Sequence, residues 1–512
     1  MLSYDELTSS ERELWDGYPG GHHVDLRASV RELDRVTEGG QWGPGRTVRA
    51  AVIVALLQGA NTAQSGAVPC LRLTGARISG RLHLAGAHIA HALWIEDCWF
   101  EEGVDLSGAS TQSIAIVGSR VPGVEAGLIR IDGRLDLRRS RLKSGSTSSF
   151  HRRVTALSLI NARVSGAVNL SGTEISAPGE WAVSAGGLVA EGGVYCADGF
   201  VAHGEVRLMG AQLAGGLHMR GALLERPGPR GVALTLDNAV ASTLDFSDGF
   251  TAHGTVRLRG ARISDSLTFE GAVLNGPPDG RSVSLAAPMM QAVDFDFTLA
   301  RPPSGTVDLT GAQVSHLLDN DRSWPDVVEL DGFVYGSVKR DEAGGQRDSV
   351  AHRMAWIRRS PGYSPQPYEQ LASWYRTAGH DDDARRVLLA RQRHRRQTLH
   401  PAARMWGHLL DVTVGYGYRP WLAGVWLFAL TLLGTLAFAT DSPNPVKRGE
   451  AAPFHSLVYT LDLLIPIAGL GQRTAWHWSN GSLQWLAHLL VAFGWLLTTA
   501  LIAGVTRTLQ KN

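Results

Sequence analysis

A pair of mostly small residues recurs every 11 residues in the middle of this 512-residue chain. The pairs are Gly75-Ala76, Gly86-Ala87, Asp97-Cys98 and Gly108-Ala109, and short runs of alternating apolar and polar residues lie between them. Alternation with a period of two predicts strands, and small residues at a fixed step predict tight corners. Such a short, regular repeat is typical of a solenoid. The sequence therefore predicts a mainly β fold, a β-helix solenoid over residues 67–338.

A longer copy within the chain supports this prediction. The string DGFVAHGEVRLMGAQL begins at Asp198 and returns as DGFTAHGTVRLRGARI at Asp248, 50 residues later. If two 11-residue units make one coil, residues 71–337 predict about 12 coils. A β-sandwich is the alternative, but it gives no reason for an 11-residue register to persist.

The segments on either side of the repeat are predicted to be helical. Because the ends of a solenoid expose unpaired backbone, residues 1–66, which contain the helical pattern TVRAAVIVALLQ, are expected to form an N-terminal helical cap. Residues 339–404 contain PYEQLASWYRTAG and ARRVLLARQRHRRQ, and they predict a basic helical hairpin linker.

Two long apolar stretches follow, in residues 405–512, which we interpret as an α-helical transmembrane module. Residues 421–440 and residues 483–506 contain no Asp, Glu, Lys or Arg. About 20 apolar residues are needed to cross the hydrocarbon core of a bilayer. Two buried helices of a soluble core are the alternative interpretation. The lipid bilayer is the partner that these stretches predict.

The distribution of charge predicts the orientation of the two spans. Seven arginines lie between residues 385 and 404, before the first span, and Arg507 and Lys511 follow the second span. By the positive-inside rule both termini are cytoplasmic, in a two-span protein of the plasma membrane. The first residues show no apolar signal-peptide stretch. The three cysteines form no CxxC pair, which fits a reducing compartment.

The segment between the spans, residues 453–471, is apolar but short. It is predicted to be either re-entrant, as in two-span channel-like pores, or an interfacial helix lying on the outer leaflet. Its candidate pore residues are Asp462, Pro466, Gly469 and Gly471. A carboxylate in such a segment is costly unless it faces water or a partner. The loop reads IAGLGQ and not TVGYG, so potassium selectivity is not supported and the ion selectivity of such a pore stays open.

The basic helix before the first span has three interpretations. Arg391, Arg393, Arg395 and Arg396 could bind anionic lipid headgroups, bind nucleic acid, or form a solvated helix face. Their position shortly before a span favours lipid headgroups. The net charge of the whole chain is +1, so no nucleic-acid partner is predicted.

The string LRLTGARISGRLHLAGAHI resembles the divergent pentapeptide-repeat proteins. That resemblance implies a right-handed β-helix in which a small residue and an apolar residue two positions later face the interior. The corresponding pairs are Ala76 with Ile78, Ala87 with Ile89, Ala211 with Leu213, and Ala261 with Ile263. The complete layout, with the tail YTLDLLIPI followed by GWLLTTALIAGVTR, resembles a group of actinobacterial membrane proteins commonly labelled membrane-associated oxidoreductases.

Two hypotheses about function follow. The first is a membrane-anchored cytosolic scaffold or sensor that binds a protein partner on the β-helix and forms homo-oligomers through a pore-like membrane module. The second is the oxidoreductase implied by the resemblance, although the chain has no G-x-G-x-x-G turn and no CxxC pair. We therefore predict no cofactor, no metal site and no catalytic residue. A flavin or haem absorbance spectrum of the purified protein would favour the enzyme.

Overall fold

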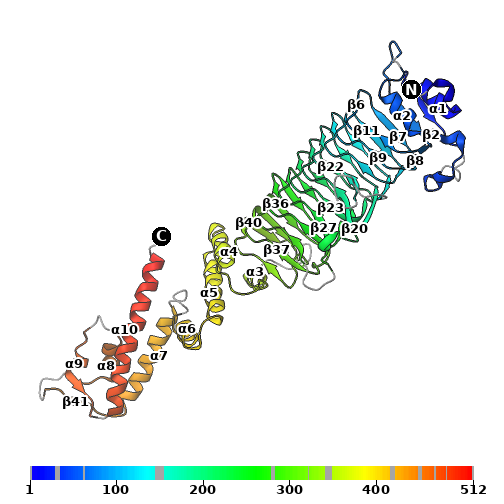
Figure 1. Cartoon of the computed structure of the whole chain (residues 1–512). Helices are drawn as coiled ribbons and strands as arrows, with labels where there is room; N and C mark the ends of the chain where they lie inside the picture. The colour runs from blue at the N-terminus through cyan, green and yellow to red at the C-terminus, as the bar shows by residue number, and fades with distance from the viewer. Residues whose placement is uncertain are drawn as a thin grey trace. The chain divides into compact units, whose positions relative to one another are not determined.

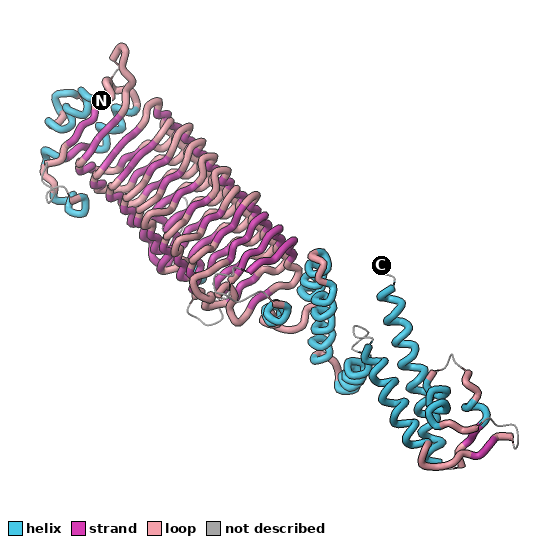
Figure 2. Tube along the Cα trace, turned by 180° about the vertical axis from the view of Figure 1, so that it is seen from behind, coloured by secondary structure: helices cyan, strands magenta, loops and turns pink. Residues whose placement is uncertain are grey.

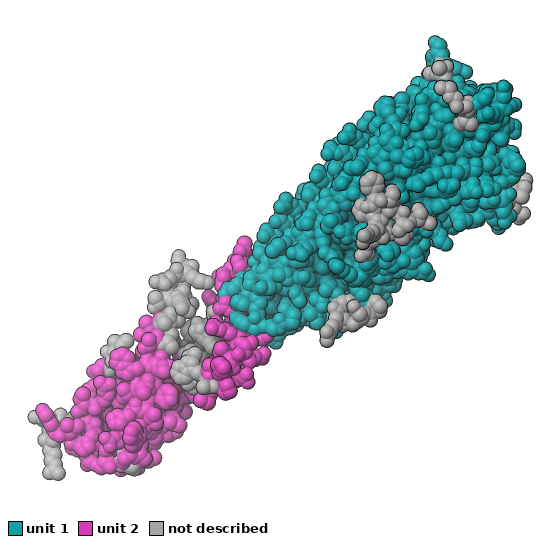
Figure 3. All heavy atoms as spheres, in the orientation of Figure 1, with its two compact units in different colours: residues 1–370 teal, residues 371–512 magenta. Residues whose placement is uncertain are grey.

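The computed structural model describes two compact units, residues 1–370 and residues 371–512 (Figure 3). The segments that it does not describe are residues 1–2, 29–34, 62–63, 145–154, 278–282, 321, 341–348, 415–420, 448–452, 466–468, 480 and 510–512.

The first unit is a parallel β-solenoid of about 11 turns (Figures 1 and 2). A coil has four short strands, as in β3 (Leu71–Thr74), β4 (Arg77–Ser79), β5 (Leu82–His83) and β6 (His88–Ile89). Each strand pairs in parallel with the strand one coil later, and Leu71 lies opposite Leu93, 22 residues on. Two 11-residue units therefore make one coil, as the sequence predicts.

Four ladders run along the solenoid. The first contains β1 (His23–Asp25), β3, β7 (Leu93–Glu96), β11 (Ile114–Val117), β15 (Leu135–Asp136), β19 (Val168–Asn169), β22 (Val194–Tyr195), β25 (Leu217–His218), β29 (Leu244–Asp245), β33 (Ser266–Thr268), β36 (Gln291–Phe297), β38 (Gln313–Asp319) and β40 (Val334–Arg340). The second contains β6, β10 (Ser110–Thr111), β14 (Arg130–Ile131), β18 (Arg163–Val164), β21 (Val189–Ala190), β24 (Gln212–Leu213), β28 (Val240–Ala241) and β32 (Arg262–Ile263), and joins β36.

The other two ladders share the long strands β20 (Glu174–Ser184) and β23 (Val201–Arg207). The third contains β2 (Thr47–Arg49), β4, β8 (Trp99–Phe100), β12 (Arg120–Val121), β16 (Arg141–Lys143), β20, β23, β26 (Leu223–Glu225), β30 (Thr251–His253) and β34 (Val273–Asn275). The fourth contains β5, β9 (Val104–Asp105), β13 (Val124–Glu125), β17 (Thr155–Ser158), β20, β23, β27 (Val232–Thr235), β31 (Thr255–Arg257), β35 (Val283–Ala286), β37 (Thr306–Asp308) and β39 (Val328–Glu329).

The number of turns is slightly below the expected 12 because some coils carry insertions. Leu135 pairs with Val168, which lies 33 residues later instead of 22. The copied 16-residue string keeps its place in the coil. Val201 pairs with Leu223 and Leu223 pairs with Thr251, so Thr251 in the second copy lies two coils after Val201 in the first, at the same position.

Most of the residue pairs that the resemblance places in the interior of the solenoid are buried. Ala76 and Ile78 are fully buried, as are the pairs that begin at Ala211 and Ala261. Ala87 is the exception, because it is only half-buried although Ile89 is fully buried. Most corner positions therefore admit only a small side chain, and the apolar residue two positions later fills the core.

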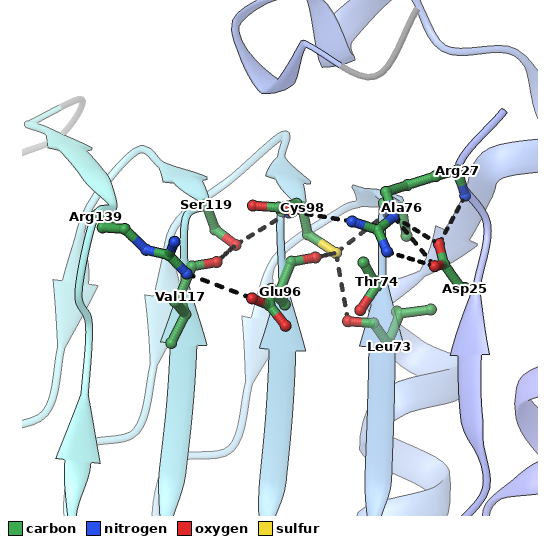
Figure 4. Close-up of polar contacts among 12 residues, drawn as sticks. Asp25, Arg27, Leu73, Thr74, Ala76, Glu96, Cys98, Val117, Ser119 and Arg139 are labelled. Atoms are coloured by element: carbon green, nitrogen blue, oxygen red, sulfur yellow. Dashed lines mark hydrogen bonds and ion pairs between the residues drawn. The ribbon is translucent and has the colours of Figure 1, made fainter. Parts of the chain in front are cut away.

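One corner shows how successive coils are joined (Figure 4). The backbone N–H of Cys98 donates to Ser119 Oγ at 3.0 Å, and Ser119 Oγ donates to the carbonyl of Val117. Outside this corner, Arg139 pairs with Glu96 at 3.5 Å. Burial raises the pKa of the Cys98 thiol to about 12, so this cysteine stays a neutral core residue.

Residues 1–66 already contain strands of the solenoid. β1 pairs with β3 and β2 pairs with β4, and two helices, α1 (Ser9–Gly17) and α2 (Ala50–Leu57), lie in the same segment. Glu11 of α1 is buried and accepts hydrogen bonds from the backbone and guanidinium of Arg49 in β2. This ion pair ties α1 to the first strand of the third ladder.

The last coil is covered by residues 349–370. The carboxamide of Gln366 accepts from the N–H of Gly332 and donates to the carbonyl of Phe333, so it takes the place of a neighbouring strand. In the same segment, Arg353 of α3 (Val350–Ile357) donates hydrogen bonds to both carboxylate oxygens of Asp319 in β38, at 2.6 and 3.0 Å. Arg353 and Asp319 are both fully buried.

The second unit is helical. The boundary between the two units falls within α4 (Gln366–Thr377). The rest of the second unit contains α5 (Asp381–Gln397), α6 (Pro401–Val414), α7 (Trp421–Phe438), α8 (Ser456–Leu464), α9 (Gln472–Ala475) and α10 (Gly481–Leu509). A two-residue antiparallel bridge joins β41 (Asn444–Pro445) to β42 (Trp476–His477). The two helical stretches expected in residues 339–404 are α4 and α5.

The inward and outward faces of the repeat give a first prediction. Ala261→Leu is expected to destabilise the protein by about 1–3 kcal/mol, because the corner has no room for a larger side chain. Its exposed neighbour provides the control, since Arg262→Glu is expected to cost less than ~0.5 kcal/mol. Thermal unfolding followed by circular dichroism compares the two variants. Equal effects would show that the two faces are misassigned.

Candidate membrane site

Two helices of the second unit are long and apolar enough to cross a membrane. They are α7, over Trp421–Phe438, and the first part of α10, over Gly481–Thr499. Only 17% of the first window and 22% of the second are buried inside the protein. A core helix of a soluble protein would be mostly buried, so this geometry argues against that alternative.

The exposed faces of these helices consist of large apolar side chains. On α7 they are Trp421, Val425, Trp426, Phe428, Leu432, Leu433 and Leu436, and on α10 they are Trp485, Leu489, Phe493, Trp495, Leu496 and Ile502. A continuous apolar surface of this kind is unfavourable in water and favourable in lipid.

Between the two long helices lies α8, in the segment for which the sequence left two arrangements open. Tyr459, near its beginning, packs edge-on against Phe438 at the end of α7, with ring centroids 5.0 Å apart. Phe438 also stacks on Trp478, just before α10 begins. These aromatic rings join the end of α7, the beginning of α8 and the beginning of α10.

From there α8 packs against both long helices. Thr460 lies against Gly434, four residues before the end of α7, which is about 6 Å along its axis. Leu464, the last residue of α8, lies against Gly494, nine residues or about 13 Å beyond Trp485. This geometry favours a re-entrant helix over one that lies across the ends of α7 and α10.

Asp462 is buried on α8, and its carboxylate has partners within the same segment. Its Oδ1 accepts the backbone N–H of Leu470 at 2.8 Å, and its Oδ2 accepts the N–H of Arg473 at 2.7 Å. Both oxygens are therefore used to hold the chain that returns from α8. Asp462 ties this loop in place instead of presenting an open carboxylate.

The other candidate pore residues lie in or beside the same loop. Gly469 and Gly471 flank Leu470, and all three residues are exposed. Gly471 has a φ of +79°, in the left-handed region that glycine adopts readily, and immediately precedes α9. Pro466 lies outside the described residues.

The four candidate lipid-binding arginines are divided by the structure. Arg393 and Arg396 of α5 both bind Asp411 of α6, at 2.9 and 3.2 Å. Burial would raise the pKa of Asp411, but the hydrogen bonds from the two arginines outweigh it and hold that pKa below its usual value. Arg395 is exposed and Arg391 is half-buried. Two of the four charges are thus already neutralised within the protein.

On the solenoid, the structure shows a pattern that the sequence reasoning missed. Histidines bind acidic side chains one coil away, as His83 does with Asp105 at 2.9 Å and His316 with Asp294 at 2.8 Å. Each pair is 22 residues apart. This spacing is one full coil, so the signal was present in the repeat itself.

One groove on the solenoid surface has a volume of about 410 Å³. Arg81, Glu101, Glu102 and Glu125 contribute its charged groups. Arg81 pairs with Glu125 at 3.5 Å and Arg77 pairs with Glu101 at 3.2 Å, so arginines already match two of the three carboxylates.

The described residues contain no group of three or more His, Cys, Asp or Glu side chains placed to hold a metal ion. Comparison with models of protein families, with curated proteins and with solved structures finds no match, so the geometry of the two units carries the argument about function.

Proposed function

We propose that this protein is a membrane-anchored scaffold, in which α7 and α10 span a bilayer and tether the β-solenoid to it. The observation that carries this proposal is the exposed apolar surface of the two helices, of which only 17% and 22% are buried. Leaving one large apolar side chain in water in place of burying it costs roughly 1.5–3 kcal/mol. Lipid removes that cost along both helices at once.

The charges that flank the spans support an orientation with the solenoid in the cytosol. Seven arginines precede α7, and Arg507 and Lys511 follow the apolar part of α10. Positive residues are retained on the cytoplasmic side. In this orientation both termini are cytoplasmic, and α8, α9 and the bridge between β41 and β42 lie toward the outer side of the plasma membrane.

The solenoid supplies the scaffold. Stacked coils present long, regular outer faces, which repeat proteins use to bind other proteins. Residues 1–338 carry eight more acidic than basic residues. This net negative charge favours a protein partner with a basic segment.

The test combines membrane extraction with cysteine labelling. The three native cysteines are buried, so an introduced cysteine provides the label. We expect the protein to stay with membranes in alkaline carbonate. A membrane-impermeant maleimide added to intact cells should label Lys447→Cys and leave Lys511→Cys unlabelled. Release by carbonate would contradict the anchor, and labelling of Lys511→Cys from outside would contradict the orientation.

A further inference from the structure

In the membrane arrangement proposed above, the loop that follows α8 presents irregular backbone at a depth where lipid cannot satisfy its N–H and carbonyl groups. Leu470 lies within hydrogen-bond distance of Asp462, which is two residues before the inner end of α8. That inner end, Leu464, meets Gly494 about 13 Å along α10 from Trp485. In a hydrocarbon core about 30 Å thick, Leu470 is then well inside the membrane.

The backbone of this loop is neither helical nor covered. Gly469, Leu470 and Gly471 are all exposed. Within the part of the chain that the structure describes, the N–H of Leu470 binds Asp462, and the carbonyl of Gly471 accepts from Thr474. No hydrogen bond in that part reaches the N–H or carbonyl of Gly469. Irregular backbone at membrane depth persists only where protein buries it or where it lines a water-filled cavity.

We propose that Gly469, Leu470 and Gly471 face a water-filled path at the centre of a ring of identical copies of this chain. The proposal rests on the membrane anchor proposed above. α7 and α10 pack against the opposite side of α8 through Gly434 and Gly494, so neither helix of the same chain can cover the loop. In a ring, every copy of the chain contacts the next copy through the same head-to-tail interface. Such a ring brings the exposed loops of all copies to a common central axis.

The side chains around the loop fit such a contact. Leu457 of α8 and Ile465, which follows α8, are exposed apolar residues, and a neighbouring copy would bury them. The polar backbone beside them would meet water on the axis. In this arrangement Asp462 is a positioning residue, because its two oxygens fix the loop from behind.

The first experiment measures the access of water to the loop. A Cβ added at Gly469 would meet no atom within 4 Å, and the backbone there is not left-handed, so Gly469→Cys fits without strain. In proteoliposomes we expect a charged, water-soluble methanethiosulfonate to modify Gly469→Cys. Phe428→Cys, on the exposed apolar face of α7, is the matched control and should stay unmodified in lipid. Leu470→Cys is the second probe if Gly469→Cys does not fold.

The second experiment tests the ring and the role of Asp462. Wild-type protein reconstituted in lipid should cross-link into oligomers and conduct ions across a planar bilayer. Asp462→Ala should slow modification at Gly469→Cys by about tenfold, which corresponds to about 1.4 kcal/mol, with carbonate extraction unchanged. An Asp441→Ala variant, which alters an exposed carboxylate three residues after the end of α7, should leave modification unchanged.

The outcomes separate this proposal from the anchor on which it rests. An inserted protein whose Gly469→Cys and Leu470→Cys thiols both resist the reagent would overturn the water-filled path. Reactive thiols in a protein that is monomeric in lipid would overturn the ring. Release of the wild-type protein by carbonate would overturn the membrane anchor and the path together.

Discussion

Asp319→Ala is expected to destabilise the C-terminal end of the solenoid by about 3–5 kcal/mol, because it leaves the guanidinium of Arg353 buried without its carboxylate. Asp319 and Arg353 are 1% and 0% exposed. Asp319 Oδ2 also accepts from the indole N–H of Trp324 at 2.7 Å, so the same change removes a second buried hydrogen bond. Thermal unfolding of the full chain in detergent, followed through the β-sheet signal in circular dichroism, measures the loss.

Two comparisons show whether burial causes the effect. Asp294 forms an exposed hydrogen bond with His316 one coil away, and Asp294→Ala is expected to cost less than about 1 kcal/mol. Changing both buried partners, with Asp319→Leu and Arg353→Met, should recover most of the stability, because no unpaired charge is then buried. If the double variant were as unstable as Asp319→Ala, the unpaired charge would not be the cause.

The solenoid could be predicted from sequence because its determinants repeat locally. The small residues at Ala76, Ala211 and Ala261 recur at the corners, and each is followed two positions later by a buried apolar residue. The 11-residue step fixes half a coil, and the register between Leu71 and Leu93 confirms it. A pattern that every coil repeats can be recognised in the sequence without knowing which residues pair between coils.

The cover of the last coil could not be predicted in the same way. Arg353 lies 34 residues after Asp319, and nothing in the local sequence marks the two as partners. Gln366, whose carboxamide bonds to the backbone of the last coil, belongs to a helix that the sequence assigned to a linker. Such contacts occur once in the chain, so no periodicity reveals them.

At the candidate site the sequence identified the unusual residue but not its partners. A carboxylate in an apolar segment marked Asp462 as costly and therefore informative. Its partners are the backbone N–H groups of Leu470 and Arg473, and backbone donors leave no signature in a sequence. In the structure, the Asp462 carboxylate therefore holds the loop in place and is not an open carboxylate that lines a pore.

The glycines of the long helices carried a signal that the sequence reasoning did not use. Glycine within a helix costs roughly 0.5–1 kcal/mol of stability relative to alanine, so a glycine in an apolar span often marks a close packing contact. Gly434 and Gly494 mark such contacts, because α8 packs directly against them. In membranes, small residues at helix contacts allow backbones to approach closely.

Gly494→Ala is therefore expected to disrupt the packing of α8, although alanine ordinarily favours a helix. A Cβ at this position would lie 2.7 Å from Leu464 Cα and close to the carbonyl oxygen of the same residue, and backbone atoms cannot yield as a flexible side chain can. Overpacking of this kind costs typically about 1–3 kcal/mol, and more where backbone must shift. The midpoint of thermal unfolding in detergent, with the yield of monodisperse protein, measures the effect.

Gly424 on α7 supplies the matched control for this change. It is also a glycine within an apolar span, but an added Cβ there meets no atom within 4 Å. Gly424→Ala should therefore leave the midpoint unchanged or raise it, since alanine is the better helix former. Opposite shifts from the same substitution would locate the effect in the contact between Gly494 and Leu464. If both variants instead unfolded at the wild-type midpoint, α8 would not pack along α10, and the re-entrant arrangement would lose its main support.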